Sequence, residues 1–314
     1  MRRVLGVLLL GLALAGCTGV IFHPMAKHVL TPDQLGLAWR DVELTAADGV
    51  RLHGWFLPAS APRQGSVLFL HGNAENISTH IASVAWLPGA GFDVFLLDYR
   101  GYGRSGGEPD LDGLHLDLAA ALDALFAMPE VDPDRVVVLG QSLGGALAIT
   151  GLADSPHKDE VRALVVEGAF TGYRALAREK LAELWLTWPL QWPLGLAIDD
   201  RHRPIERIGE LTPVPVLIIQ GEADRIVPPH HGVALFDAAH EPKQLWLLPQ
   251  TGHNQAFARV ENRMRLRDYL DGILTPARPP PARPRAPRRG PPRRAPAGAA
   301  ADRRPRSPGA PARP

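Results

Sequence analysis

"RVVVLGQSLGGALAI", residues 135–149, places a serine at a corner between two different patterns. β-Branched residues run up to Gly140, and an Ala/Leu-rich segment leaves after Gly144. The first pattern predicts a buried strand and the second a helix. A strand, then Gly-X-Ser-X-Gly, then a helix is typical of a nucleophile elbow, in which Ser142 occupies a tight and strained turn. The alternative is a glycine-rich turn whose serine only caps the helix.

Short apolar runs on both sides of this corner indicate the fold class. They are "SVLFL", "FDVFLLD", "RVVVLG", "VRALVVEG", "VPVLIIQG" and "KQLWLLP", and helical patterns such as residues 111–128 and 230–240 alternate with them. Continuous apolar strands between helices are typical of a parallel sheet buried on both faces. Residues 41–59 alternate around an Asp-Gly turn, which predicts an antiparallel hairpin. We therefore expect an α/β fold with about eight mostly parallel strands and helices on both faces.

A serine at such a corner needs a base, and the base needs a carboxylate to orient it. In the order Ser, acid, His that accompanies this elbow, Asp224 follows "VPVLIIQG" and His253 follows "KQLWLLP". Both come after strands, at the edge where open α/β sheets bind ligands. Glu167, which ends "VRALVVE", is the alternative acid. The backbone N–H groups of Leu143 and of Asn73, in "LHGNAEN", are the predicted oxyanion donors.

The first 17 residues are typical of an export signal. Two arginines precede an apolar stretch that is too short to span a membrane, and small residues lead to Cys17. The segment "LAGC" resembles a bacterial lipobox, in which the chain is cut before the cysteine and the thiol is lipidated. Cys17 is the only cysteine, which suits acylation and excludes disulfides within the chain. A plain signal peptide with a chance cysteine is the alternative.

These features predict where the protein resides. We expect export to the bacterial cell envelope and anchoring to a membrane through lipid at Cys17. Thr18, rather than an aspartate, follows the cysteine, which favours the outer membrane.

Composition divides the chain into four parts. They are the signal segment 1–17, a linker 18–39, a globular domain 40–274 and a Pro/Arg-rich tail 275–314 that we expect to be disordered. The globular domain is acidic, so we expect no nucleic-acid partner for it. The tail holds eleven arginines and one aspartate, and either binds an anionic ligand or is simply solvated.

One interval inside the domain is too long for a single crossover. We therefore predict a small helical cap at about residues 170–210, between "EGAF" and "VPVLIIQG". Trp185, Trp188 and Trp192 cluster there, and either line an acyl pocket or pack the cap onto the body.

Five blocks of the domain together resemble the α/β-hydrolase superfamily: "HGNAEN", "DYRGYGRSGGEP", "GQSLGG", "GEADRIVP" and "TGHN". They are most similar to the monoglyceride-lipase and serine-aminopeptidase-like hydrolases and to the eukaryotic protein depalmitoylases. The resemblance implies Ser142 as nucleophile, Asp224 as acid and His253 as base, with Asn73 and Leu143 forming the oxyanion hole. It implies neither a metal nor an organic cofactor.

The expected function is that of a serine hydrolase. We expect it to cleave the ester or thioester bond of a small-molecule or lipid acyl substrate through an acyl-enzyme. An aminopeptidase-like amide hydrolase and a non-catalytic envelope lipoprotein of the same fold are the alternatives. A metal role for His230 and His231 would need further ligands that the sequence does not reveal.

Overall fold

The computed structural model describes residues 21–275, except 184 and 197. The predictions for the signal segment, for Cys17 and for the Pro/Arg-rich tail fall on residues outside this range. Each helix in the described part of the chain is too short or too polar to cross a bilayer.

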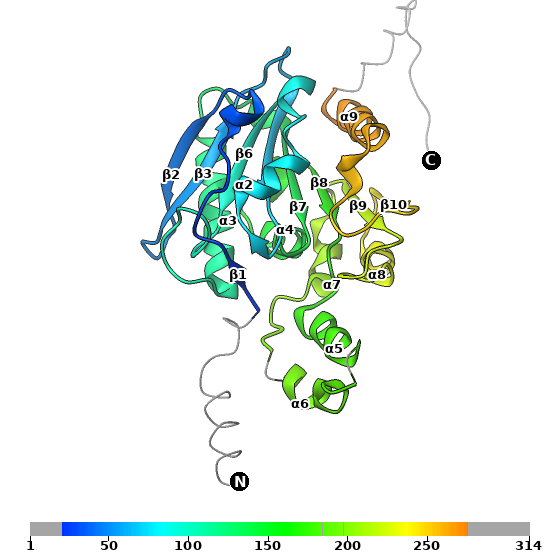
Figure 1. Cartoon of the computed structure of the whole chain (residues 1–314). Helices are drawn as coiled ribbons and strands as arrows, with labels where there is room; N and C mark the ends of the chain where they lie inside the picture. The colour runs from blue at the N-terminus through cyan, green and yellow to red at the C-terminus, as the bar shows by residue number, and fades with distance from the viewer. Residues whose placement is uncertain (1–20, 184, 197, 276–314) are drawn as a thin grey trace, which may run out of the picture. The chain divides into compact units, whose positions relative to one another are not determined.

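An eight-stranded sheet forms the centre of the molecule (Figure 1). Its order is β10-β9-β8-β7-β4-β6-β3-β2; β2 and β3 form an antiparallel hairpin, β3 is antiparallel to β6, and the other pairs are parallel. This confirms the predicted mostly parallel sheet with its antiparallel edge. The strands are β2 (Arg40–Thr45), β3 (Arg51–Leu57), β4 (Gly65–Leu70), β6 (Phe92–Asp98), β7 (Val136–Gln141), β8 (Val161–Glu167), β9 (Val216–Gly221) and β10 (Lys243–Leu248).

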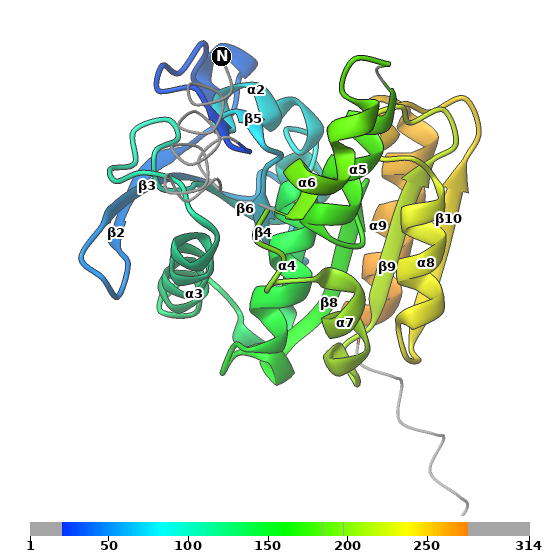
Figure 2. The same cartoon turned by 90° about the horizontal axis from the view of Figure 1, so that it is seen from below.

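Helices cover both faces of the sheet because the strands are apolar on both sides. In β4, Leu68 and Leu70 enter one core, whereas Val67 and Phe69 enter the other. Figure 2 shows α9 on the opposite side of the sheet from α4 and α8. The first core is covered by α3 (Leu111–Phe126), α4 (Leu143–Ala153) and α8 (His230–Ala238), and the second by α2 (Ile77–His80) and α9 (Val260–Leu274).

The segment after β8 carries the helices of the predicted cap region. They are α5 (Tyr173–Glu183) and α6 (Gln191–Leu196), and we call residues 173–196 the cap. Residues 204–211, nearly all within the predicted cap range, form α7 (Pro204–Arg207) and a following turn that pack on α4.

The tryptophans of the cap differ from both expectations for them. Trp185, Trp188 and Trp192 are 85%, 59% and 61% exposed, so they neither line an enclosed pocket nor pack the cap onto the body. The physical reason is that α5, the helix that leads to them, buries only its first residue, Tyr173.

The residues before β2 are bonded to the body rather than free of it. β1 (His23–Pro24) pairs in parallel with β5 (Ala74–Glu75), which follows β4. We call residues 21–31 the N-terminal strap. Most of the hydrogen bonds between the strap and the body use backbone groups of the strap, and such bonds leave no pattern of apolar residues in the sequence.

We expect Gly144→Ala to destabilise the protein. A Cβ at Gly144 would lie 2.1 Å from the carbonyl oxygen of Leu70, so β4 and α4 would have to separate. Such overpacking costs about 1–3 kcal/mol, measurable as a loss in the free energy of unfolding in urea. Gly272 in α9 is the control, because no atom lies within 4 Å of its Cβ position. Gly272→Ala should leave stability unchanged or raise it by up to about 1 kcal/mol; equal losses in both variants would contradict the close crossing.

Candidate active site

Ser142 stands at the carboxyl end of β7 with a strained backbone. Its φ and ψ are 53° and −113°, a sparsely populated region for a residue that carries a Cβ. The Ser142 N–H donates to the carbonyl of Glu167 at 2.8 Å, and its carbonyl accepts from the N–H of Ala146 at 3.0 Å. These bonds hold the corner between strand and helix. Ser142 is largely covered by its surroundings, with 8% of its surface exposed to solvent.

The structure brings Asp224 and His253 together at the same edge of the sheet. Asp224 follows β9 and His253 follows β10, and Nδ1 of the histidine lies 2.7 Å from Oδ2 of the aspartate. The other oxygen, Oδ1, accepts from the N–H groups of Ile226 and Val227 at 2.8 and 2.9 Å. Because the carboxylate is the acceptor, the proton sits on Nδ1, and Nε2 of a neutral ring is left free to act as a base.

The surroundings of Asp224 favour its ionised form. Burial by itself would raise its pKa, but the hydrogen bond and charge of His253 and the two backbone N–H donors together lower the pKa below its usual value. An ionised carboxylate next to the ring can stabilise an imidazolium during proton transfer.

The ring of His253 lies against the residue that follows β8. A Cβ on Gly168 would be 3.1 Å from Cε1 of His253, and Gly168 is adjacent to Glu167, whose carbonyl holds the Ser142 N–H. The Ser142 side chain does not cap α4, and the hydrogen bond of the His253 ring among the described residues is the one from Nδ1 to Asp224 rather than one to the Ser142 hydroxyl. Catalytic hydrogen bonds of this kind are often long without substrate and tighten when it binds.

Glu167, the alternative acid, has other partners. Gln141 Nε2 donates to its Oε2 and the Ala256 N–H to its Oε1, both at 2.7 Å. Burial raises the pKa of Glu167, against the effect of these two donors. The glutamate thus braces β7 and the last loop, and the carboxylate bonded to His253 is that of Asp224.

The two predicted oxyanion donors come from different loops at this edge. In the part of the chain that the structure describes, neither the Leu143 N–H nor the Asn73 N–H has an acceptor. The former opens α4, where the N–H groups lack intrahelical partners and the helix dipole is positive. The carbonyl of Asn73 accepts from the Tyr102 hydroxyl at 2.7 Å, which fixes the second loop.

His71 braces the same loop. Its Nδ1 lies 2.7 Å from the carbonyl of Gly72, and its own carbonyl accepts from the Tyr99 hydroxyl at 2.9 Å. Burial lowers the pKa of His71 to about 3, so the ring is neutral and structural.

Two polar side chains near the elbow were not singled out from the sequence. Gln141 Oε1 and Asn254 Oδ1 are buried and lack hydrogen-bond partners in the described structure. Asn254 has φ of 53°, a conformation that asparagine tolerates better than most residues, and its Oδ1 lies 3.1 Å from the Cβ position of Gly168. The feature of the sequence that could have drawn attention to Asn254 is its position directly after His253.

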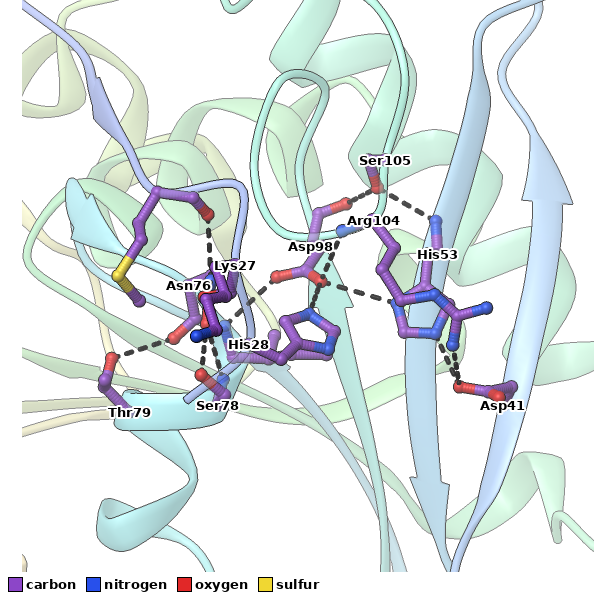
Figure 3. Close-up of polar contacts among 12 residues, drawn as sticks. Lys27, His28, Asp41, His53, Asn76, Ser78, Thr79, Asp98, Arg104 and Ser105 are labelled. Carbon is purple, nitrogen blue, oxygen red and sulfur yellow. Dashed lines mark hydrogen bonds and ion pairs between the residues drawn. The ribbon is translucent and has the colours of Figure 1, made fainter. Parts of the chain in front are cut away.

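Asp98 is a further buried group that sequence reasoning missed. It ends β6 and accepts from the N–H groups of Ile77 and Arg104 and from Nε2 of His28, the last at 2.7 Å (Figure 3). Despite burial, which opposes ionisation, the bonds from His28 and His53 hold the pKa of Asp98 well below its usual range. This network ties the N-terminal strap to the sheet edge.

Within residues 21–275, as far as the structure describes them, two groups of side chains have the composition of a metal site. In each, three potential ligand atoms lie within 4.8 Å of one another, and Glu179 supplies the third ligand that the sequence did not reveal for His230 and His231. Each group is already held by its own hydrogen bonds between imidazole and carboxylate. The groups are His28, His53 and Asp98, and Glu179, His230 and His231.

A strained serine after a strand, with a histidine–aspartate pair at the same edge of a doubly covered sheet, defines a hydrolase-like site on an α/β fold. Residues 61–202 match the family described as "Serine aminopeptidase, S33". The uncharacterized protein YfhR of Escherichia coli (strain K12) is 35% identical over 244 residues, which cover 76% of this chain and 81% of YfhR. The α/β-hydrolase domain-containing protein WAV2 of Arabidopsis thaliana is 35% identical over 222 residues, 68% of this chain and 70% of WAV2.

Among solved structures, the esterase Pf2001 of Pyrococcus furiosus superposes with a TM-score of 0.66 at 24% identity. The match covers 81% of this chain and 98% of the esterase, and shows the same fold. The chain belongs to the α/β-hydrolase family, and the family supports hydrolase activity. The matched family region ends at residue 202, before Asp224 and His253, so their pairing comes from the structure.

The pKa of Asp224 predicts a pH-dependent contribution to stability. A carboxyl whose pKa is lower in the folded state stabilises the fold above its unfolded pKa of about 3.9, and this stabilisation is lost as the pH falls through the folded value. Asp224→Asn should therefore be less stable than the wild type at pH 7, with a difference that shrinks below about pH 4. Urea denaturation at pH 3, 5 and 7 measures it; a difference independent of pH would contradict the ionised pair.

Proposed function

We propose that this protein is a serine hydrolase that cleaves carboxylic ester or thioester bonds of an acyl substrate. Ser142 is the nucleophile, His253 the general base and Asp224 the carboxylate that orients it. The observation that carries the proposal is the 2.7 Å bond between His253 Nδ1 and Asp224 Oδ2, at the sheet edge where the strained Ser142 stands.

The reaction follows from these positions. Nε2 of His253 takes the proton of Ser142 while the serine oxygen attacks the acyl carbon, and the Asn73 and Leu143 N–H groups stabilise the oxyanion. The protonated ring then gives its proton to the leaving group, which departs and leaves an acyl-enzyme. Water, activated by the same ring, releases the acid. Loss of one oxyanion donor raises the barrier by about 2.7–4 kcal/mol, so the loop around Asn73 has to be held firmly.

Amide hydrolysis is the second candidate. The family that matches residues 61–202 is described as a serine aminopeptidase, which favours it. Both reactions use the same nucleophile and base, and a screen of p-nitrophenyl esters, acyl thioesters and aminoacyl amides with the purified protein separates them by kcat/KM.

Matched carboxamide substitutions distinguish the two carboxylates. Asp224→Asn should lower kcat at least about 10³-fold, because the His253 ring loses the carboxylate that orients it. Ser142→Ala should lower kcat by at least as much, because it removes the nucleophile. Glu167→Gln keeps the shape of the side chain and an oxygen for the Ala256 N–H, and Gln141 can turn its amide so that its unpaired oxygen accepts from the new NH2. This variant should therefore retain kcat within about tenfold. The measurement is ester hydrolysis by each folded variant. A larger loss in Glu167→Gln than in Asp224→Asn would exchange their roles.

A fluorophosphonate probe tests whether the serine reacts at all. The wild type should be labelled at Ser142, and Ser142→Ala should not be labelled. A folded wild type that stays unlabelled would overturn the proposal and favour a non-catalytic lipoprotein of this fold.

The proposed setting is a membrane of the bacterial cell envelope, reached by export and acylation of Cys17. The support is the apolar signal, the "LAGC" segment and the presence of one cysteine in the chain. Several acyl chains on that residue would make anchoring stable, whereas one chain alone binds only marginally.

Cys17→Ser tests the anchor in living bacteria. The wild type should incorporate radiolabelled palmitate, and its mass should correspond to cleavage before Cys17 plus acyl chains. The variant should carry no label and should keep the signal segment, because the cut depends on the cysteine. Wild-type protein that is unlabelled and cleaved elsewhere would show a plain signal peptide instead.

A further inference from the structure

The N-terminal strap is fixed to the body along its length at the carboxyl edge of the sheet (Figure 3). Asn76 Nδ2 donates to the carbonyls of Met25 and Lys27 at 2.8 and 2.9 Å. The Val29 N–H donates to the Ser78 hydroxyl at 2.9 Å. Together with the hydrogen bond between His28 and Asp98, these bonds fix the path of the strap over the edge.

The first described residues lie beside the loop that carries an oxyanion donor. Asn73 Nδ2 donates to the Ile21 carbonyl at 2.6 Å, and Asn73 Oδ1 accepts from the His23 N–H at 3.2 Å. Four residue steps separate Ile21 from Cys17, a reach of at most about 14 Å even when fully extended. Lipid on Cys17 therefore holds the bilayer surface close to the edge that bears Ser142.

The cap presents an apolar surface at the same end of the molecule. Five of the twelve large apolar side chains that stand exposed in the described residues lie between 185 and 196. Figure 1 shows α5 and α6 of the cap and β1 of the strap at the same, lower end of the body. Exposed apolar surfaces of this kind mark interaction sites in soluble proteins. The five exposed apolar side chains of the cap are Trp185, Leu186, Trp188, Trp192 and Leu196.

The chemistry of this surface fits a lipid interface. Tryptophan is enriched where bilayer meets water, because its ring is apolar while its N–H and dipole suit the headgroup layer. A cationic side chain accompanies it: the Arg178 guanidinium stacks on the Trp192 ring at 3.4 Å and adds a positive charge to this surface.

We propose that the cap enters the interface of a lipid bilayer and holds the carboxyl edge of the sheet, with Ser142, toward the membrane. This rests on the proposed anchor at Cys17. We propose a bilayer, rather than a second copy of the chain, as the partner of the cap. The reason is that at most about 14 Å of chain separates Ile21, which is bonded at this edge, from lipid on Cys17. The substrate class that this orientation serves is an acyl ester or thioester held in the membrane.

The experiment uses the whole lipidated protein in vesicles of phosphatidylcholine. These lipids carry no net charge, so the arginine-rich tail contributes little. In vesicles that contain brominated phosphatidylcholine, tryptophan fluorescence should be strongly quenched in the wild type. Trp185→Ser/Trp188→Ser/Trp192→Ser should lose most of that quenching.

The matched control replaces three exposed apolar residues away from the cap. Leu247→Ser/Val260→Ser/Met264→Ser lie on β10 and α9, keep all the tryptophans and should be quenched as the wild type is. All three proteins should hydrolyse a short soluble ester at equal rates. A long-chain ester embedded in the vesicles should be cleaved about tenfold more slowly by the cap variant than by the control.

The outcomes separate this inference from the proposed function. Wild-type quenching no greater than that of the cap variant would overturn the membrane orientation even if soluble esters are hydrolysed. Self-association that depends on the three tryptophans, measured by sedimentation in detergent together with absent quenching, would make a second copy the occupant. Quenching without any hydrolysis would uphold the orientation and refute the serine hydrolase.

Discussion

The close contact between α4 and the end of β4 is the constraint on which the rest of the site depends. A side chain at Gly144 has no room, since its Cβ would lie 2.1 Å from the Leu70 carbonyl oxygen, and one at Gly140 would lie 2.4 Å from the Gly144 carbonyl oxygen. Strand and helix can therefore meet only through a sharp corner, and Ser142 takes up the strain. The same contact aims the positive end of α4 at the space in front of the serine.

The remaining parts of the site are held by buried polar groups at the same edge. Parallel strands deliver Asp224 and His253 there, and backbone donors keep the carboxylate ionised. The loop of Asn73, the proposed oxyanion donor, is held from two sides, by Tyr102 through the Asn73 carbonyl and by the N-terminal strap through the Asn73 side chain. The strap in turn depends on Asp98 at the end of β6. The proposed membrane attachment at Cys17 and the loop of Asn73 thus meet at the same, N-terminal end of the strap.

Local sequence patterns predicted most of the fold and the identity of the paired groups. Apolar runs gave the strands, because a strand buried on both faces must be apolar at every position. The glycines around Ser142 gave the elbow, because the Gly-X-Ser-X-Gly spacing is contained in five consecutive residues. What the patterns could not show was how polar groups pair: the strap bonds through backbone carbonyls, and Glu179 joins His230 and His231 from a helix 51 and 52 residues earlier.

The sequence by itself determined an α/β-hydrolase fold and an elbow serine, since apolar periodicity and glycine spacing are written in consecutive residues. Only the tertiary structure shows which of the two carboxylates bonds His253. Asp224 and Glu167 both follow strands, but the loop after β10 returns His253 to the first, whereas Gln141 and a backbone N–H occupy the second. It also decided that the cap's tryptophans face solvent. Both outcomes depend on how segments that are distant in the sequence pack together, and such a contact produces no repeating pattern of residues in the sequence.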